Sequence, residues 1–291
     1  MKVLLTGSRG FIGKHLHSNL INQGLRVFPI TFSNESDDIL HFDHLLKNPL
    51  EYLQRDDVLV HLASPKRGES RRVHEEFYSR SIELINVANL IGIKKIIVTG
   101  SGSEFGQTCN RLGKVRDSDL LLPMDEYSKS KVLISDYISK NVSIPFTYIR
   151  IFQVYGLGSN LPKLDAEIRK SILTKANLVI KTPDAIKDFV NLCDVIKLII
   201  NEILDSLGNN FINFSSGEGT SVLNFVEKIF SALPEEFRPN TESILESNQP
   251  IHSINYYVGE PSDVVRRANL VKSISQFGNL ELLEALNNCR C

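Results

Sequence analysis

The chain has 291 residues, of which 42% are hydrophobic and 23% charged, a composition that excludes a disordered or fibrous protein and suffices for a full buried core. Its formal net charge of −1 gives no electrostatic reason to expect nucleic acid or an anionic membrane as a partner. No apolar run approaches the ~20 residues that a membrane span needs. We therefore expect a protein that binds neither nucleic acid nor a membrane.

The cysteines are Cys109, Cys193, Cys289 and Cys291. Their spacing does not match that of a metal site, and nothing in it argues for an oxidising compartment. We expect a reduced, cytoplasmic protein that holds no metal.

The first half alternates short β-branched apolar runs with helical patterns, which is typical of βαβ units and a parallel sheet. Strands are expected at 3–6, 26–31, 58–62, 95–99 and 145–152, and helices at 11–23, 75–90 and 127–140. After about residue 153 the pattern is less regular. The predicted fold class is α/β, a doubly wound parallel (Rossmann) sheet with a smaller, interleaved C-terminal α/β substrate lobe. The dinucleotide-binding domain would comprise residues 1–156 plus about 184–206, and the substrate lobe about 157–183 plus 207–291.

A glycine-rich loop, Thr6-Gly7-Ser8-Arg9-Gly10-Phe11-Ile12-Gly13, lies between the first expected strand and helix. In a dinucleotide site Gly7 permits the tight turn, Gly10 lets the backbone approach the pyrophosphate, and Gly13 lets helix and strand pack closely. The helix N-terminus then faces the phosphate charge. The sequence predicts a dinucleotide cofactor held by this loop, including Phe11 and Ile12.

A tyrosine and a lysine, Tyr127 and Lys131, lie four residues apart on an expected helix and hence on one face. Free tyrosine titrates near ~10, so we expect the nearby ammonium and a nicotinamide ring to lower the Tyr127 pKa. This pair would carry proton transfer, and Lys131 would also hold the nicotinamide ribose.

The Gly-x-x-Gly-x-x-Gly spacing and the Tyr-x-x-x-Lys pair resemble the extended branch of the short-chain dehydrogenase/reductase superfamily, whose members act on nucleotide-activated sugars. The resemblance covers nearly the whole chain and implies homodimers formed through first-lobe helices. The run from Val98 to Gly106 resembles the family's Ser-Ser-Ser-x-x-Val-Tyr-Gly segment, which puts the catalytic hydroxyl on Ser101. This hydroxyl would hydrogen-bond the reacting oxygen, and Ser103 would reach the substrate.

The choice of nicotinamide cofactor depends on the end of the second strand. NAD-selective relatives carry an acid there, whereas this chain has Thr31 followed by Phe32 and Ser33. Arg9 lies where NADP-using relatives often have a basic residue near the 2′-phosphate. We therefore favour NADP(H) and leave NAD(H) open. Further cofactor contacts implied by the resemblance are Thr31, Ser33, Asp43, Leu62, Ala63, Ser64, Lys66 and Phe152.

Substrate contacts follow from weaker matches. Gln153 replaces an asparagine that contacts the sugar diphosphate in the family, and Lys187 replaces a diphosphate-binding arginine. Glu260 stands where many members have a phosphate-clamping arginine, so Arg266 or Arg267 would substitute for it.

The resemblance favours simple carbonyl reduction. Dehydratases of the family carry Asp and Glu directly after the catalytic hydroxyl, where this chain has Gly102 and Ser103, and Glu104 is one place too far along. We predict an NAD(P)H-dependent reductase of a nucleotide-linked 4-keto-6-deoxy sugar. The alternatives are a nucleotide-sugar epimerase with retained NAD and a non-catalytic NADP-binding sensor.

Overall fold

The computed structural model describes residues 1–32, 40–156, 158–159, 163–205, 208–235, 238, 244–246, 256–267 and 271–272. Contacts divide the chain into two units, each described by itself below. The first comprises Met1–Glu104, Leu121–Arg150 and Ile196–Ile212, and the second comprises Phe105–Leu120, Ile151–Val195 and Asn213–Cys291.

These units and the expected domains assign several segments differently. Residues 105–120, 151–156 and 184–195 were expected in the dinucleotide-binding domain and fall in the second unit, whereas 207–212 were expected in the substrate lobe and fall in the first. How the units correspond to cofactor and substrate binding stays a prediction.

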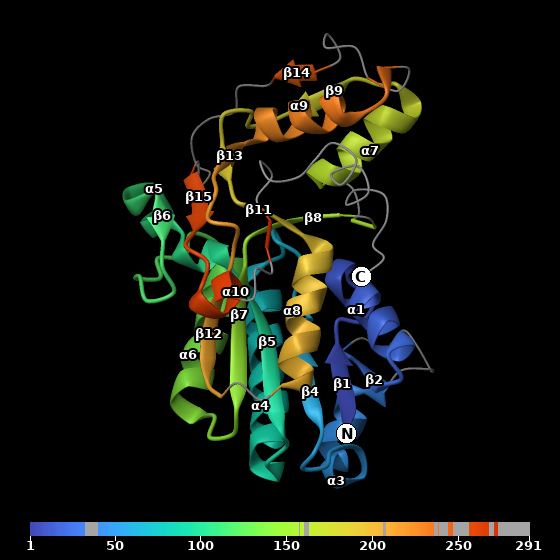
Figure 1. The fold of residues 1–291 in the computed structure, drawn as a ribbon. Coiled ribbons are helices and arrows are strands. Elements are labelled where there is room, and N and C mark those ends of the chain that lie inside the picture. Colours follow the sequence, from blue (N-terminus) through green and yellow to red (C-terminus); the bar gives the residue numbers. More distant parts are fainter. Residues whose placement is uncertain are drawn as a thin grey trace. The chain divides into compact units, whose positions relative to one another are not determined.

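The first unit is built on a seven-stranded sheet (Figure 1) with the order β12-β7-β5-β4-β1-β2-β3. The strands are β1 (Lys2–Thr6), β2 (Arg26–Thr31), β3 (Leu40–His41), β4 (Val58–His61), β5 (Lys95–Ser101), β7 (Phe146–Ile151) and β12 (Asn210–Phe214). β1 pairs in parallel with both β2 and β4, β2 with β3, and β4 with β5. This is the doubly wound order, whose direction reverses between β1 and β4. The predicted Rossmann fold class is confirmed.

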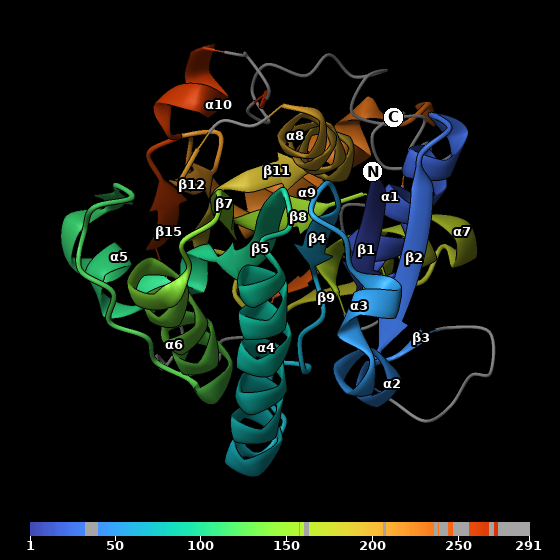
Figure 2. The same cartoon turned by 90° about the horizontal axis from the view of Figure 1, so that it is seen from below.

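Helices cover both faces of this sheet. They are α1 (Phe11–Asn22), α2 (Phe42–Lys47), α3 (Pro49–Tyr52), α4 (Arg71–Ile91), α6 (Glu126–Asn141) and α8 (Leu192–Leu204). Figure 2 shows α4 and α6 on one face, and α1 and α8 on the other. Alternate strand residues such as Leu4, Leu59 and Ile96 pack against Leu84 of α4 and Ile134 of α6 in one apolar core. The strands and helices expected in the first 152 residues are therefore confirmed.

The ion pair between Lys95 and Glu202 is buried in the first unit. The Lys95 ammonium lies 2.6 Å from a Glu202 carboxylate oxygen, and their side chains are 1% and 0% exposed. The Thr147 hydroxyl donates to the same oxygen at 2.6 Å. Removal of either residue would leave the other as an unpaired buried charge, which is strongly destabilising.

The second unit contains shorter elements. They are α5 (Gln107–Leu112), β6 (Lys114–Val115), β8 (Gln153–Tyr155), α7 (Leu164–Thr174), β9 (Leu178–Ile180), β10 (Ile186–Lys187), β11 (Phe189–Asn191), β13 (Thr220–Ser221), α9 (Val222–Ala232), β14 (Ile244–Glu246), β15 (Tyr256–Gly259) and α10 (Asp263–Arg267). The strands form a four-stranded sheet, β13-β10-β15-β6, and the pairs β11-β8 and β14-β9. Its core includes Phe225 of α9, whose ring stacks on Phe189 with centroids 3.9 Å apart.

A buried carboxylate ties the second unit together. Asp188 accepts hydrogen bonds from the Ser216 backbone N–H and hydroxyl and from the backbone N–H groups of Gly217 and Gly259. Burial nevertheless raises the pKa of Asp188 to about 6, because desolvation of the charged form outweighs the four hydrogen bonds.

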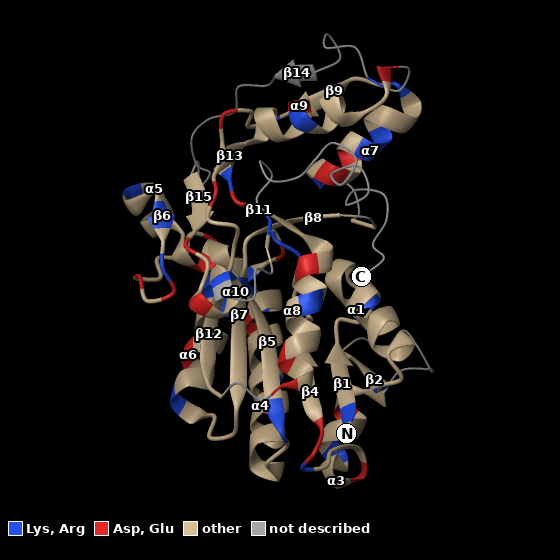
Figure 3. Cartoon of the chain, in the orientation of Figure 1, with Lys and Arg blue, Asp and Glu red and all other residues tan. Residues whose placement is uncertain are grey.

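The charges of the molecule are mixed. Figure 3 shows acidic and basic residues interspersed in both units. Within the part of the chain that the structure describes, no helix combines the length and apolar character needed to cross a bilayer.

Candidate active site

The glycine-rich loop lies where β1 and β4 end side by side. Gly7 follows β1 with a φ of +71°, and a Cβ there would lie 2.7 Å from the backbone N of Ala63. A Cβ on Gly13 would overlap the Gly7 carbonyl. The tight turn expected at Gly7 is present, and the loop is glycine-rich because its backbone packs directly against Leu62 and Ala63.

A hydrogen-bond chain fixes this end of the two strands. The Thr6 hydroxyl accepts from the Ala63 N–H at 3.1 Å and lies 2.8 Å from His61 Nδ1. His61 Nε2 lies 3.1 Å from the Ser81 hydroxyl, which donates to the Phe77 carbonyl. These contacts assign the proton to Nε2, and burial together with the Lys131 charge lowers the pKa of His61 to about 3. His61 is therefore a neutral structural histidine.

The first turn of α1 suits a diphosphate. Its N-cap, Gly10, provides no side-chain cap, and no acidic residue lies in the first turn. The backbone N–H groups of a helix N-terminus attract anions, and nothing local opposes one here. Arg9, in the loop before this turn, is exposed. The residues present therefore fit the pyrophosphate of a dinucleotide.

The residues expected near the adenosine gather at the end of β2. Thr31 pairs with His41 of β3, and Asp43 lies in the first turn of α2. The Asp43 carboxylate is 3.6 Å from the Arg80 guanidinium, which donates to the Phe32 carbonyl at 2.8 Å. Ser33 lies outside the described residues. After β4, Ser64 and Lys66 are exposed. Their contacts with a cofactor stay predictions.

Helix α6 presents Tyr127 and Lys131 from a well-defined start. Asp125 caps the helix by accepting from the Ser128 N–H at 2.7 Å, an interaction that typically contributes ~1 kcal/mol. Tyr127, in the first turn, is half-buried. One turn later Lys131 is 1% exposed and donates from Nζ to the Thr99 carbonyl at 2.8 Å. The expected same-face arrangement on one helix is present.

The Ser101 hydroxyl lies at the end of β5. It is 2.9 Å from the Ser103 hydroxyl and accepts from the Ser103 N–H at 3.2 Å. Interaction with the Ser101 hydroxyl is one of the influences that lower the pKa of Tyr127. The structure thus brings Ser101, Tyr127 and Lys131 together, and Ser103, which is 3% exposed, orients Ser101.

The proton affinity of Tyr127 differs from the sequence expectation. Burial raises the pKa of Tyr127 above its usual value, and this effect outweighs the Arg67 charge, which lowers it. Burial also lowers the pKa of Lys131 to about 8, so its side chain is mainly an ammonium at neutral pH. Tyr127 is therefore a neutral phenol able to donate a proton, and the expected lowering of its pKa was wrong for the protein alone.

Three side chains around Tyr127 were not expected to contribute to the site. The Arg67 guanidinium lies 5.1 Å from the Tyr127 ring centroid and 3.1 Å from the Asp125 carboxylate. The His74 ring meets the Tyr127 ring edge-on at 6.3 Å, and neither of its buried nitrogens has a hydrogen-bond partner among the described residues. Arg67 is a loop residue in a basic run and His74 is a single helix residue, so no motif marked them.

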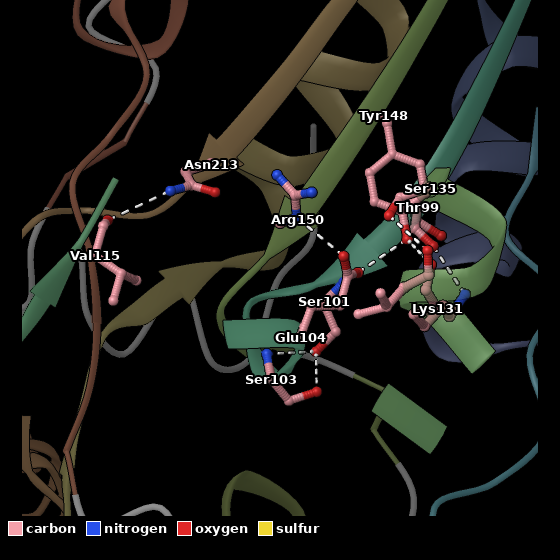
Figure 4. A network of polar contacts seen from close by, with 11 residues as sticks. Thr99, Ser101, Ser103, Glu104, Val115, Lys131, Ser135, Tyr148, Arg150 and Asn213 are labelled. Carbon is pink, nitrogen blue, oxygen red and sulfur yellow. Dashed lines mark hydrogen bonds and ion pairs between the residues drawn. The ribbon is translucent and has the colours of Figure 1, made fainter. Parts of the chain in front are cut away.

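Glu104 is the third of these side chains. It lies in a 3₁₀ turn after β5, Gly102–Phe105, and is fully buried. Its carboxylate accepts from the Ser101 N–H at 2.7 Å and from Arg150 Nε at 2.9 Å (Figure 4). We expected Glu104 to lie one place too far along to act as a dehydratase acid, and its contact with Ser101 was not foreseen.

Apart from Ser103, which lies in the first unit, the residues expected to bind substrate lie with Phe152 in the second unit. The Phe152 ring is 5% exposed and packs 4.8 Å from the Tyr257 ring. Gln153 belongs to β8, and its N–H donates to the Asp188 carbonyl. Lys187 Nζ lies 5.6 Å from the same Tyr257 ring. The structure shows these positions without testing the predicted contacts.

Arg266, which was expected to bind the substrate phosphate, already forms ion pairs within the protein. Arg266 is exposed but forms ion pairs with Glu260 at 3.1 Å and Asp263 at 2.6 Å. Glu260 also pairs with Arg116 at 3.1 Å. Nothing is described of the Arg267 side chain. A substrate diphosphate would have to compete with two carboxylates for Arg266, so its role as a clamp stays a prediction.

Comparison with known proteins identifies a family and several relatives of this chain. The sequence model described as the NAD dependent epimerase/dehydratase family matches residues 3–206. GDP-6-deoxy-D-talose 4-dehydrogenase of Aggregatibacter actinomycetemcomitans is 25% identical over 285 residues, covering 91% of this chain and 90% of the relative. The dTDP-4-dehydro-6-deoxyglucose reductase of Escherichia coli is 22% identical over 281 residues, covering 86% of each.

Solved structures share the fold. The structure of UDP-N-acetylglucosamine 4-epimerase from Methanobrevibacter ruminantium M1, in complex with UDP-N-acetylmuramic acid, superposes with a TM-score of 0.78. Its sequence identity is 19%, and the match covers 98% of this chain and 97% of that one.

Proposed function

Because the chain belongs to the NAD-dependent epimerase/dehydratase family, we propose that it is an NAD(P)H-dependent reductase of a nucleotide-linked 4-keto-6-deoxy sugar. The observation that carries the proposal is the placement of the Tyr127 phenol beside the Ser101 hydroxyl, with Lys131 one turn further along the same helix. Such a set donates a proton to a carbonyl oxygen, which is what reduction requires.

Each of the three side chains has a distinct task in this scheme. The Ser101 hydroxyl donates a hydrogen bond to the substrate carbonyl oxygen, and Tyr127 gives this oxygen its phenolic proton. The ammonium of Lys131 then stabilises the phenolate that remains, since an opposite charge favours the ionised form. A bound nicotinamide would supply the hydride. The loop 7–13 and residues 62–63 would hold the dinucleotide, because their close-packed backbone leaves the α1 N-terminus facing its phosphates.

Reduction is favoured over dehydration by the acids that are present. Elimination of water needs an acid and a base directly after the hydroxyl residue, and Gly102 and Ser103 provide neither. The nearest carboxylate, Glu104, is engaged with Ser101 and Arg150. Two relatives are themselves named as a 4-dehydro-sugar reductase and a 6-deoxy-sugar 4-dehydrogenase, which supports the same substrate class.

The proposed cofactor is NADP(H). Thr31 brings no carboxylate to the end of β2 that would repel a 2′-phosphate, and Arg9 is exposed in the phosphate loop. Arg9→Ala should weaken NADPH binding while leaving NADH binding unchanged, as measured by nucleotide fluorescence. Equal losses for both nucleotides would contradict the role given to Arg9.

The proposed function is tested with NADPH and a dTDP- or GDP-linked 4-keto-6-deoxy sugar as the probes. Tyr127→Phe should bind NADPH like the wild type and lose turnover by roughly a hundredfold or more, because general-acid catalysis is removed. Tyr137→Phe, on the same helix, is the matched control and should keep its activity. Normal turnover of Tyr127→Phe would contradict the proton-donor role.

The alternatives give different outcomes in the same preparation. Tightly retained NAD⁺, released only on denaturation, would favour epimerisation and overturn the assignment of a dissociable reductant. Nicotinamide binding without turnover of any 4-keto sugar would favour a sensor.

A further inference from the structure

Glu104 collects an unusual set of hydrogen bonds behind the candidate active site. Oε1 accepts from the Ser101 N–H at 2.7 Å and from the Tyr148 hydroxyl at 2.9 Å, and Oε2 accepts from Arg150 Nε at 2.9 Å. The Tyr148 hydroxyl also lies 2.9 Å from the Lys131 carbonyl (Figure 4). One carboxylate thus joins the Ser101 loop, strand β7 and the helix that carries Lys131.

The surrounding backbone is adapted to this carboxylate. A Cβ on Gly100 would overlap both the Tyr148 ring and Glu104 Oε1. Any other residue at position 100 would therefore displace the phenol or the carboxylate. Gly100, Glu104 and Tyr148 form one closely fitted group directly behind Ser101.

Glu104 lies near a second buried cation, Lys131, in addition to its ion-pair partner Arg150. Glu104 is 0% exposed, and Arg150 and Lys131 are 4% and 1% exposed, so two cations and one anion share a dry region. A buried cation is costly unless an opposite charge lies near it. Glu104 raises the pKa of Lys131 and so offsets part of the effect of burial.

We propose that Glu104 is the positioning residue of this site, with its carboxylate anchoring the Ser101 loop and serving as the counter-charge of the Lys131 ammonium. The inference rests on the proposed function for the roles of Ser101 and Lys131. Glu104 itself touches no reacting atom and acts through these two residues.

Other titratable groups around Lys131 do not replace this counter-charge. Besides Glu104, the groups that face Lys131 or its neighbour Tyr127 from the adjoining elements are His61, Arg67, His74, Asp125, Tyr148 and Arg150. His61 is neutral, and burial raises the pKa of both tyrosines. Asp125 is 39% exposed and paired with Arg67. Among the described groups around Lys131, Glu104 is therefore the buried carboxylate that can serve as its counter-charge.

The direct test is a titration of Lys131 by NMR, with 13C at the lysine Cε and Lys131→Arg to assign the signal. The wild type should titrate near pH 8. Glu104→Gln keeps a hydrogen-bond acceptor but removes the charge, so the titration should move to lower pH. Glu104→Asp keeps the charge, and Tyr148→Phe removes a hydrogen bond without changing charge, so both should titrate like the wild type.

Two results would overturn the counter-charge role. One is a Glu104→Gln titration at or above the wild-type pH, and the other is a shift in Glu104→Asp as large as that in Glu104→Gln. If Glu104→Gln alone does not fold, Glu104→Gln/Arg150→Gln, in which neither partner is left as an unpaired charge, replaces it, and it should titrate at lower pH than its reference Arg150→Gln. The titration needs no sugar substrate, so it remains decisive even if the proposed function fails.

The positioning role is read from turnover. Glu104→Gln should lose roughly five- to tenfold more kcat at high pH, above the Lys131 titration, than at neutral pH, because loss of the Glu104 charge lowers the pKa of Lys131 and leaves less of its ammonium at high pH. Glu104→Asp withdraws the carboxylate from the Ser101 N–H, so it should lower kcat at all pH values while the KM for NADPH stays unchanged. A pH profile of Glu104→Gln parallel to that of the wild type would contradict the proposal.

Discussion

The glycine loop allows two properties of Gly7, its positive φ and its close approach to another strand, to be separated by substitution. Gly7→Ala places a Cβ 2.7 Å from Ala63 N and 2.9 Å from the Leu62 carbonyl carbon. Gly24→Ala is the matched control, because Gly24 has a φ of +78° and no atom within 4 Å of the added Cβ. Both variants carry the same conformational strain, and only Gly7→Ala also carries the overlap.

The magnitudes follow from this geometry. The left-handed backbone costs a non-glycine residue ~1–2 kcal/mol, which is the expected loss in unfolding free energy for Gly24→Ala. Nonbonded heavy atoms ordinarily approach to ~3.5 Å, so Gly7→Ala must displace backbone by roughly 0.7 Å. Overpacking of this kind adds ~1–3 kcal/mol, and we expect a total of ~2–5 kcal/mol for Gly7→Ala.

Urea unfolding of the two variants measures these losses, and NADPH titration measures binding. Gly7→Ala should bind NADPH more weakly because the loop backbone has moved, whereas Gly24→Ala should bind like the wild type. Equal destabilisation by the two substitutions, or unchanged NADPH binding by folded Gly7→Ala, would refute the close-approach reasoning.

Two further predictions concern buried charges. Lys95→Met leaves the Glu202 carboxylate without its buried partner and should cost ~3–5 kcal/mol of unfolding free energy. Lys95→Met/Glu202→Leu removes both charges and should cost clearly less. Urea unfolding that ranks the double variant as the less stable would contradict this prediction. Burial raises the pKa of Asp188 from the ordinary aspartate value of 3.8 to about 6 in the folded protein. Between these values the folded state binds the extra proton, so the Asp188 contribution to stability decreases as pH rises through this window. The difference in unfolding free energy between wild type and Asp188→Asn should therefore change by on the order of 3 kcal/mol across it, and a flat difference would contradict the raised pKa.

The sheet of the first unit was predictable because its signals are local. Short β-branched runs alternate with helical spacing, and most expected strand ends agree with the structure to within one or two residues. Pro29 lacks a backbone N–H and so disfavours a strand at this position, yet it is tolerated in β2. The reason is that β3 pairs only with Ile30 and Thr31, so at Pro29 the strand is paired with β1 alone.

The candidate site was only partly predictable. Ser101, Tyr127 and Lys131 follow from motif spacing, and the structure brings them together. The pKa of Tyr127 is raised because residues remote in sequence bury the phenol, an effect larger than that of the positive charges from which the sequence analysis expected a lowered pKa. Arg67 lies over the Tyr127 ring because of a loop conformation that no periodicity marks. Glu104 reaches Ser101 because a 3₁₀ turn redirects its side chain after the strand.

The second unit was the least predictable part. Its strands are two to four residues long, too short for periodicity to identify. Arg266 was expected to bind phosphate, yet its ion pairs with Glu260 and Asp263 depend on a helix of only five residues. Sequence spacing alone does not show which neighbouring charge an exposed arginine selects.

The central claim, that this site reduces a sugar carbonyl with a dissociable cofactor, is tested most directly by isotope transfer. The wild-type protein is incubated with NADPH carrying deuterium at the transferred position and with a nucleotide-linked 4-keto-6-deoxy sugar, and the product is analysed by mass spectrometry and NMR. We predict one deuterium at C4 of the product sugar with the wild type, and no product with Tyr127→Phe. A sugar product that carries no deuterium from added NADPH would contradict the account and indicate that the reaction proceeds through a retained nucleotide.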